Sequence, residues 1–297
     1  MKQSYLQDEE IRIIGGKGWI KNTSEQSSTL KRQYPYPYII GGIIVCIVLT
    51  AIIGFYIYRH HSYRFSYPVS RSEEDVIEQL ETPTVPLSPG VFYAKDSLLG
   101  VPLHIYRLQG LSAEFAEGVP SLDDPDIYLI TRNADYRYEN DEKVIIGDYI
   151  ENGITLSENH WRAGYFISVG DHFDIGVGRH PDIKEYAIKK QGNMFRQFAL
   201  VSAGIKCTSQ YELKGKVTRC AYARKAGNQF YFIETVNPET LYGFADALIE
   251  YGFVDAIYVT GGAQPSLFYR DEEGNAHGTY VDDKPHRMVV WKKRNSF

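Results

Sequence analysis

The sequence predicts an α+β fold with a mostly β core, a few covering helices and a single transmembrane helix that precedes them. Short apolar and aromatic runs recur between turn-forming residues over the carboxy-terminal two thirds of the chain, which is typical of β-strands. Few stretches there repeat apolar residues at helical spacing. One earlier run of about twenty residues carries no charge. Many strands with few helices indicate an α+β architecture.

The amino-terminal part is expected to hold a tail and a membrane span. Residues 1–36 are polar with scattered charges and are expected to form a short, mostly disordered tail. Residues 37–58 are expected to form a transmembrane helix, since the run 38–58 is uncharged, crosses a hydrocarbon core of about 30 Å and has aromatic residues at both ends. A cleavable signal peptide would be shorter, would start earlier and would end at small residues. Membrane lipid is therefore an expected partner of residues 38–58.

The remainder is expected to be a stalk followed by one domain. Residues 59–90 are rich in Ser, Pro, Glu and Arg, which is typical of a stalk, with a brief helix at Glu73–Leu80. Residues 91–297 suffice for a single core. The predicted strands are Leu103–Leu108, Ile127–Thr131, Lys143–Ile146, Gly164–Ile167, Phe198–Val201, Gln229–Ile233 and Ala256–Val259. The predicted helices are Pro181–Lys190 and Thr240–Tyr251.

Composition narrows the range of functions. The net charge of −5 and the lack of a basic cluster argue against nucleic-acid binding. The 24 tyrosines suit sheet packing and carbohydrate-facing surfaces. Cys207 and Cys220 either form a disulfide in an oxidising compartment or remain buried thiols. The chain has no Cys/His cluster, so no metal site is expected, and no motif identifies a cofactor.

The most informative stretch runs from Arg219 to Ser266. A short aromatic strand is followed by a helix that starts near Thr240 and stops at Gly252, and then by a second strand. Gly261-Gly262 follows that strand. Glycines there allow a tight turn or bring backbone N–H groups close to a ligand. Polar residues at the end of a buried strand are a common place for a site.

This stretch resembles the carboxy-terminal core of the phosphodiester glycosidase family. That family shows R-[TN]-A-[IV]-G, then a strand, a T-hydrophobic-x-x-[FL]-A helix and L-D-G-G-x-S. The residues that stand at the family's motif positions here are Arg219-Cys220-Ala221-Tyr222-Ala223, Thr240, Leu241, Phe244, Ala245, Leu248, Gly252, Ala256, Val259, Thr260, Gly261, Gly262 and Ser266. Looser matches are Ile146–Ile150 or Ala163–Phe166 for the family's N-G-x-[FY]-F strand end, and Gly192–Gly204 for its central motif.

The resemblance implies an extracytoplasmic domain that hydrolyses a sugar phosphodiester, with a carbohydrate or phosphosugar as its ligand. The basic residues on the two sides of the apolar run are nearly balanced, so this implication decides the expected orientation. One position departs from the family: Thr260 stands where the family has the aspartate of D-G-G. A hydroxyl does not replace a carboxylate as a charge or proton acceptor. A binding module without catalysis, or an envelope scaffold with a vestigial pocket, therefore remains an alternative.

The resemblance also implies candidate substrate-binding residues. Arg219 would clamp a phosphate, because a guanidinium binds oxyanions with two hydrogen bonds; a structural ion pair is the other interpretation. Thr260, Gly261 and Gly262 would line the sugar side, or form only a tight turn. Gln264 and Ser266 would bind sugar hydroxyls, or be polar residues of a surface loop.

Three further residues are candidates for proton transfer. Asp148 follows a glycine at a strand end and would supply the acidity missing at position 260. His160 and His172 flank a Gly-Tyr-Phe strand, and histidine exchanges protons near neutral pH. The other interpretation of all three is that they are solvated loop residues.

Overall fold

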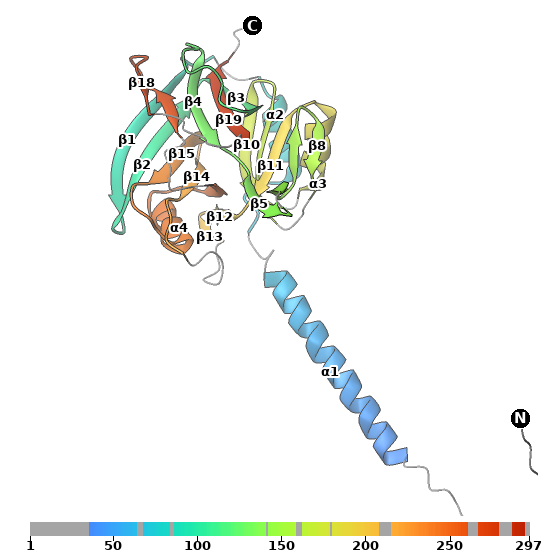
Figure 1. Ribbon diagram of the computed structural model, residues 1–297. Helices are drawn as coiled ribbons and strands as arrows, with labels where there is room; N and C mark the ends of the chain where they lie inside the picture. The colour runs from blue at the N-terminus through green and yellow to red at the C-terminus, as the bar shows by residue number, and fades with distance from the viewer. Residues whose placement is uncertain are drawn as a thin grey trace, which may run out of the picture. The chain divides into compact units, whose positions relative to one another are not determined.

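The computed structural model describes residues 36–63, 68–83, 86–140, 142–158, 162–178, 180–207, 215–260, 267–278 and 287–294. The chain divides into two compact units, Met1–Ile57 and Tyr58–Phe297. In the described part of the second unit, strands far outnumber helices (Figure 1), and this confirms the predicted mostly β fold class.

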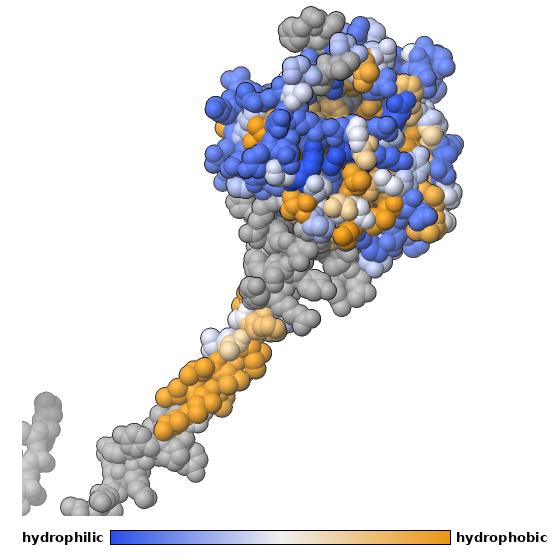
Figure 2. Space-filling model, turned by 180° about the vertical axis from the view of Figure 1, so that it is seen from behind, coloured by the Kyte–Doolittle hydropathy of each residue, from blue (hydrophilic) through white to orange (hydrophobic). Residues whose placement is uncertain are grey.

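The first unit contains most of α1 (Tyr36–Tyr63), a helix of 28 residues. At a rise of 1.5 Å per residue this helix is about 42 Å long. Its stretch Ile40–Ile57 is long and apolar enough to cross a membrane, and none of that stretch is buried in the structure. Figure 2 shows that the described surface of this helix is almost continuously apolar. An apolar surface of this length suits lipid better than water.

A seven-stranded antiparallel sheet is the centre of the second unit. Its order is β1-β2-β15-β14-β16-β12-β13. The strands are β1 (Gly90–Leu98), β2 (Val101–Gln109), β15 (Gln229–Thr235), β14 (Cys220–Lys225), β16 (Asp255–Val259), β12 (Ala199–Ser202) and β13 (Ile205–Lys206). Strands from distant parts of the sequence therefore meet at its middle.

Two five-stranded sheets and a hairpin complete the β structure. One sheet has the order β10-β9-β11-β7-β8 and the other β18-β17-β4-β19-β3. The first contains β10 (His172–Val177), β9 (Gly164–Val169), β11 (Asn193–Gln197), β7 (Tyr149–Glu151) and β8 (Ile154–Ser157). The second contains β18 (Ala276–His277), β17 (Phe268–Arg270), β4 (Ile127–Arg132), β19 (Arg287–Lys293) and β3 (Leu111–Glu117). The hairpin is formed by β5 (Asp135–Glu139) and β6 (Glu142–Ile146).

Helix α4 (Leu241–Glu250) covers one face of the central sheet. The Thr240 hydroxyl accepts a hydrogen bond from the Gly243 N–H at 3.0 Å, so the threonine caps this helix as its position in the sequence predicts. The helix buries a stripe of apolar side chains against strands β2, β14 and β15. These side chains are Leu241, Phe244, Ala245, Ala247 and Leu248.

The opposite face of the central sheet packs against the other two sheets. Tyr222 of β14 lies there between Phe166 of β9 and Trp291 of β19, with ring centroids 5.2 and 5.6 Å away. Its hydroxyl accepts a hydrogen bond from the Trp291 indole at 3.0 Å. This aromatic core explains part of the high tyrosine content: such rings are fully buried, with their polar atoms paired.

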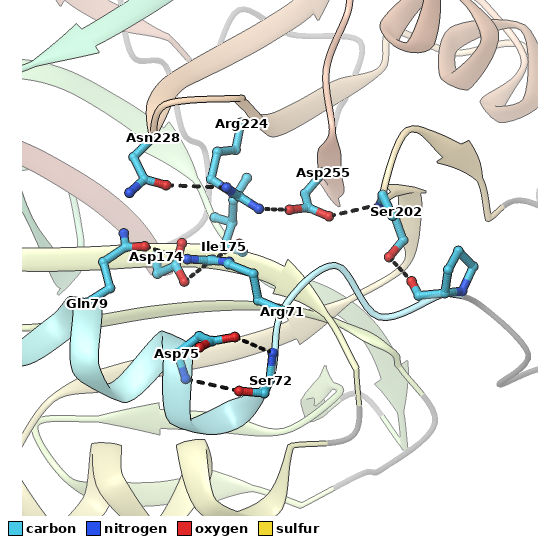
Figure 3. Close-up of polar contacts among 12 residues, drawn as sticks. Arg71, Ser72, Asp75, Gln79, Asp174, Ile175, Ser202, Arg224, Asn228 and Asp255 are labelled. Atoms are coloured by element: carbon cyan, nitrogen blue, oxygen red, sulfur yellow. Dashed lines mark hydrogen bonds and ion pairs between the residues drawn. The ribbon is translucent and has the colours of Figure 1, made fainter.

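Part of the segment expected as a stalk packs into the domain. Helix α2 (Glu73–Glu81) begins with a capping box, in which Ser72 and Asp75 exchange hydrogen bonds between side chain and backbone (Figure 3). Val76 and Leu80 are almost fully buried against residues of β9, β11 and α3 (Pro181–Lys189). Packing of the domain therefore begins before Val91, because this apolar face needs cover.

Of two buried ion pairs, one joins this region to β10 and the other links two strands of the central sheet (Figure 3). Arg71 pairs with Asp174 of β10, and it also donates to the Ile175 carbonyl at 3.3 Å. Arg224 of β14 pairs with Asp255 of β16. Burial raises the pKa of Asp174 to about 6, although Arg71 opposes the rise. Removing one partner of such a pair would leave a buried charge uncompensated.

Candidate functional site

Four side chains lie side by side across the central sheet, one on each of four neighbouring strands. Strand pairing places His104 of β2 opposite Glu234 of β15, Glu234 opposite Cys220 of β14, and Cys220 opposite Val259 of β16. Neighbouring strands are about 4.8 Å apart, so this cross-strand row is about 14 Å wide. Cys220 and Val259 pack with the aromatic core. The row therefore lies on the face opposite α4, at the end of the sheet where the Arg219–Ser266 motif begins.

Glu234 provides a carboxyl group in the cross-strand row. The Cys220 thiol donates a weak hydrogen bond to its Oε1 at 3.9 Å. Burial raises the pKa of Glu234, although Cys220 and the positive charge of Arg132 oppose the rise. A carboxylate with a raised pKa accepts protons near neutral pH better than an ordinary one. Burial also raises the pKa of Cys220, so that its thiol stays protonated and is not a nucleophile.

Arg132, the last residue of β4, provides a positive charge next to the cross-strand row. Its charge acts on both Glu234 and Cys220. Its Nε atom is buried and has no hydrogen-bond partner in the described part of the chain. A guanidinium does not lose its proton in proteins. Arg132 is therefore a fixed cation with an unused donor, and it is suited to an anionic group such as a phosphate.

His104 is a second proton acceptor in the row. The Tyr93 hydroxyl lies 2.7 Å from its Nδ1 and fixes the ring. Burial and the charge of Lys95 lower the pKa of His104, so that the ring is neutral at pH 7. Glu234 and His104 are direct cross-strand neighbours, and neutral histidine and carboxylate together offer two sites for a proton.

Arg219 lies next to the row, with its side chain on the other face. Its Nε donates to the Glu239 carbonyl at 2.9 Å, and its Nη2 donates to the Gly215 carbonyl. Its guanidinium lies 5.9 Å from the ring of Tyr258, on the face covered by α4. These contacts join the segment before the motif to the turn before α4, and phosphate binding by Arg219 stays a prediction.

Thr260 directly follows the last paired residue of β16 and is the last described residue of its segment. Its hydroxyl oxygen is buried without a hydrogen-bond partner among the described residues. The strand pairing thus brings Thr260 and Arg219 to the same end of two adjacent strands. Five predicted site residues lie outside the described part of the chain: His160, Gly261, Gly262, Gln264 and Ser266.

Asp148 belongs to another sheet, at the start of β7. Its carboxylate pairs with Arg196 at 3.2 Å and lies 3.9 Å from Lys184. The Arg196 side chain also donates to the Gly178 carbonyl at 2.7 Å. This buried network holds β7, β11 and the start of α3 together. It gives Asp148 a structural function, and a catalytic one stays a prediction.

His172 lies at the opposite end of the same sheet. Strand pairing places Asp148 level with Arg196 of β11, Tyr165 of β9 and Gly176 of β10. Gly176 is four residues from His172 along β10. Four residues of strand span about 13 Å, so the structure does not bring these two candidates together. Burial and the charge of Arg294 lower the pKa of His172.

The described residues contain no group of three His, Cys, Asp or Glu side chains that would hold a metal ion. Cys207 and Cys220 are both buried and free, so they are two buried thiols and do not form a disulfide. Cys207 packs with Val177 and Ala199, whereas Cys220 lies in the aromatic core.

Glu234, Arg132 and His104 were not among the residues predicted from the sequence. One signal for Glu234 was present: it follows Phe230 and Phe232 at a spacing of two, which places a carboxyl group on an otherwise apolar strand face. Arg132 directly follows the predicted strand Ile127–Thr131, and residues after a buried strand often belong to sites. No local pattern shows that these residues meet, since the register between distant strands decides it.

The fold is distantly similar to that of a phosphodiester glycosidase domain. No family model matches the chain, and no curated protein matches its sequence. Among solved structures it is similar to the zebrafish N-acetylglucosamine-1-phosphodiester alpha-N-acetylglucosaminidase catalytic domain, auto-inhibited by its pro-peptide. The identity is 10%, the TM-score is 0.49, and the match covers 78% of this chain and 97% of that one. A hypothetical protein from Synechocystis matches at 11% identity and a TM-score of 0.47, over 72% of this chain and 64% of that one.

Proposed function

We propose that the protein is a membrane-anchored hydrolase of a sugar phosphodiester, with its β domain outside the cytoplasm in the cell envelope or a secretory lumen. The resemblance of Arg219–Ser266 to the phosphodiester glycosidases motivates the reaction. The observation that carries the proposal is that the positive charge of Arg132, whose Nε has no hydrogen-bond partner among the described residues, acts on Glu234, a carboxyl group with a raised pKa. Glu234 lies at the end of the central sheet that holds this motif, and Arg132 ends β4 of an outer sheet, from where its charge acts on Glu234.

The reaction breaks the bond between the sugar carbon C1 and a phosphate oxygen. Arg132 balances the negative charge that stays on the departing phosphate. Glu234 takes the proton from the attacking water, whose oxygen joins C1, and the proton then leaves through His104 or the phosphate. Thr260 and the residues after it would line the sugar side.

A hydrolysis assay with matched variants tests this proposal. The full-length protein is incubated with UDP-glucose, UDP-N-acetylglucosamine and methyl phosphodiesters of sugar 1-phosphates, and the released sugar and phosphate monoester are quantified. Glu234→Gln should lower kcat at least a hundredfold, because general-base catalysis contributes roughly 10²- to 10⁴-fold. The control is Glu250→Gln, at an exposed glutamate that ends α4. Equal rates for the two variants, or no turnover of any substrate by the wild type, would refute the proposal.

The pH profile gives a second readout. A general base must be deprotonated, so the rate should fall on acidification through the pKa of Glu234, at a higher pH than for an ordinary glutamate. Arg132→Lys should raise KM and lower kcat while the acid limb stays in place. An acid limb at an ordinary glutamate pKa would contradict the assigned base.

A binding module on the same scaffold is the second candidate, and Thr260 favours it because the family's aspartate is missing there. Thr260→Asp separates the two candidates. New hydrolysis without weaker binding of sugar phosphodiesters would support a module that has lost catalysis. If the wild type already turns over and Thr260→Asp adds nothing, the binding-module interpretation fails.

A further inference from the structure

An aromatic surface lies beside the cross-strand row, where the central sheet meets the outer sheet that contains β17 and β18. It is formed by Tyr93 of β1, His104 and Tyr106 of β2, Tyr269 of β17 and His277 of β18, and we name it the aromatic patch. The Tyr93 ring lies 5.2 Å from Tyr106 and 5.6 Å from Tyr269, and the last two rings are 5.0 Å apart. Residues from two separate parts of the sequence, 93–106 and 269–277, thus form one continuous group of rings.

Some rings of the patch are buried and others face solvent. Tyr106 is only 4% exposed and forms the base of the patch, whereas Tyr93 is 38% exposed. The side chain of His277 is 43% exposed and stacks on Tyr269 at 4.8 Å. Tyr93 and His277 therefore present ring surface that no described residue covers completely.

Hydrogen bonds hold these exposed rings in place. Asp271 binds the Nε2 atom of His277 at 2.5 Å, and the Tyr93 hydroxyl binds His104 at 2.7 Å. Rings that are fixed before a ligand arrives lose little side-chain entropy on binding. Tyrosine in particular supplies large contact area at low entropic cost.

The aromatic patch adjoins the proposed catalytic residues of the cross-strand row. His104 belongs to both, and the negative charge of Glu234 acts on the hydroxyls of Tyr93 and Tyr106. His104 therefore connects the patch to Glu234, because its ring contacts Tyr93 and its strand position is opposite Glu234.

We propose that the aromatic patch is a second sugar-binding subsite, so that the ligand is an oligosaccharide with a ring on Tyr93 and His277 and the adjoining unit at Glu234. This inference rests on the proposed function for the chemistry at Glu234. The C–H face of a pyranose ring is apolar and stacks on aromatic rings, while its hydroxyls pair with phenol, imidazole and carboxylate groups. Tyr93, His277 and Asp271 offer that combination on one surface.

Isothermal titration calorimetry of the full-length protein tests the subsite. The protein is placed in lipid nanodiscs, which avoid sugar-based detergents, and is titrated with maltotriose, mannotriose and chitotriose. At least one trisaccharide should bind saturably. Tyr93→Ala should weaken its binding at least tenfold, and Tyr93→Phe less than threefold, because phenylalanine keeps the stacking face. The matched control is Tyr242→Ala, at a tyrosine 44% exposed on α4, which should leave binding unchanged.

Two results would overturn the subsite: no saturable binding of any trisaccharide, or equal binding by the Tyr93→Ala and Tyr242→Ala variants. Neutral trisaccharides contain no phosphodiester, so their binding does not depend on turnover. Binding that depends on Tyr93 without any hydrolysis would sink the hydrolase proposal and leave the subsite standing. Hydrolysis with a Tyr93→Ala variant that binds trisaccharides normally would do the reverse.

Discussion

Replacing Leu80 by alanine should destabilise the whole domain, although the sequence around it resembles a linker. Leu80 is 3% exposed and packs from α2 into the cluster that contains Ile150, Ile167 and Met194. A buried leucine reduced to alanine costs about 2–5 kcal/mol, because both transfer free energy and cavity contacts are lost. For a domain of this size each kcal/mol lowers the melting temperature by about 2–4 °C, so a mid-range loss of about 3 kcal/mol corresponds to about 9 °C.

Tryptophan fluorescence during thermal unfolding measures this effect, because Trp291 is fully buried in the aromatic core and reports on the domain rather than on α1. The control is Glu78→Ala, an exposed position of the same helix. This substitution removes one exposed charge and no buried contact, so the melting temperature of the variant should stay within about 1 °C of wild type. Equal melting temperatures for Leu80→Ala and Glu78→Ala would show that α2 is not part of the cooperative unit.

Three further predictions follow from buried groups. The pKa of Asp174 is raised from 3.8 to about 6, so the folded state holds its proton more tightly, and the unfolding free energy should fall by about 3 kcal/mol at most as pH rises from 4 to 6. Urea titrations at several pH values should show that Asp174→Asn lacks this slope. Gly147→Ala should cost about 1–3 kcal/mol more than Gly227→Ala in the same titrations: both glycines have positive φ, but only at Gly147 would a Cβ lie 2.5 Å from the Arg196 carbonyl oxygen. Burial raises the pKa of Cys207 to about 12, so a thiol reagent should modify it only under conditions that unfold the domain, and modification in native buffer would refute its burial.

The elements that local sequence predicts well are those whose own apolar spacing decides them. The predicted helix at Thr240–Tyr251 is α4 (Leu241–Glu250), because a capping threonine and a complete apolar stripe are both local. The expected brief helix at Glu73–Leu80 also forms, but its packing against the domain was not foreseen. Only Val76 and Leu80 mark its buried face, within a stretch of charged residues.

The candidate site was harder to predict than the fold. Arg219 and Thr260 lie at the same end of two adjacent strands because β14 pairs with β16. Asp148 was chosen for its place after a glycine, and its partner Arg196 comes from a strand almost fifty residues away in the sequence. Glu234 lies opposite His104 because β15 pairs with β2, and these two residues are 130 positions apart in the sequence. Such registers depend on the whole fold, and a single sequence does not reveal them.

The strand order also has a consequence for how the domain folds during its synthesis. In one outer sheet β19 lies between β3 and β4, and its residue Lys293 pairs with Leu111. Contacts so distant in sequence form slowly, because a long loop must close before they stabilise anything. During synthesis β3 and β4 therefore lack the strand that lies between them until β19 has left the ribosome. Over that interval their edges are open to other chains, and chaperone capture of the nascent domain should end only when β19 has been synthesised.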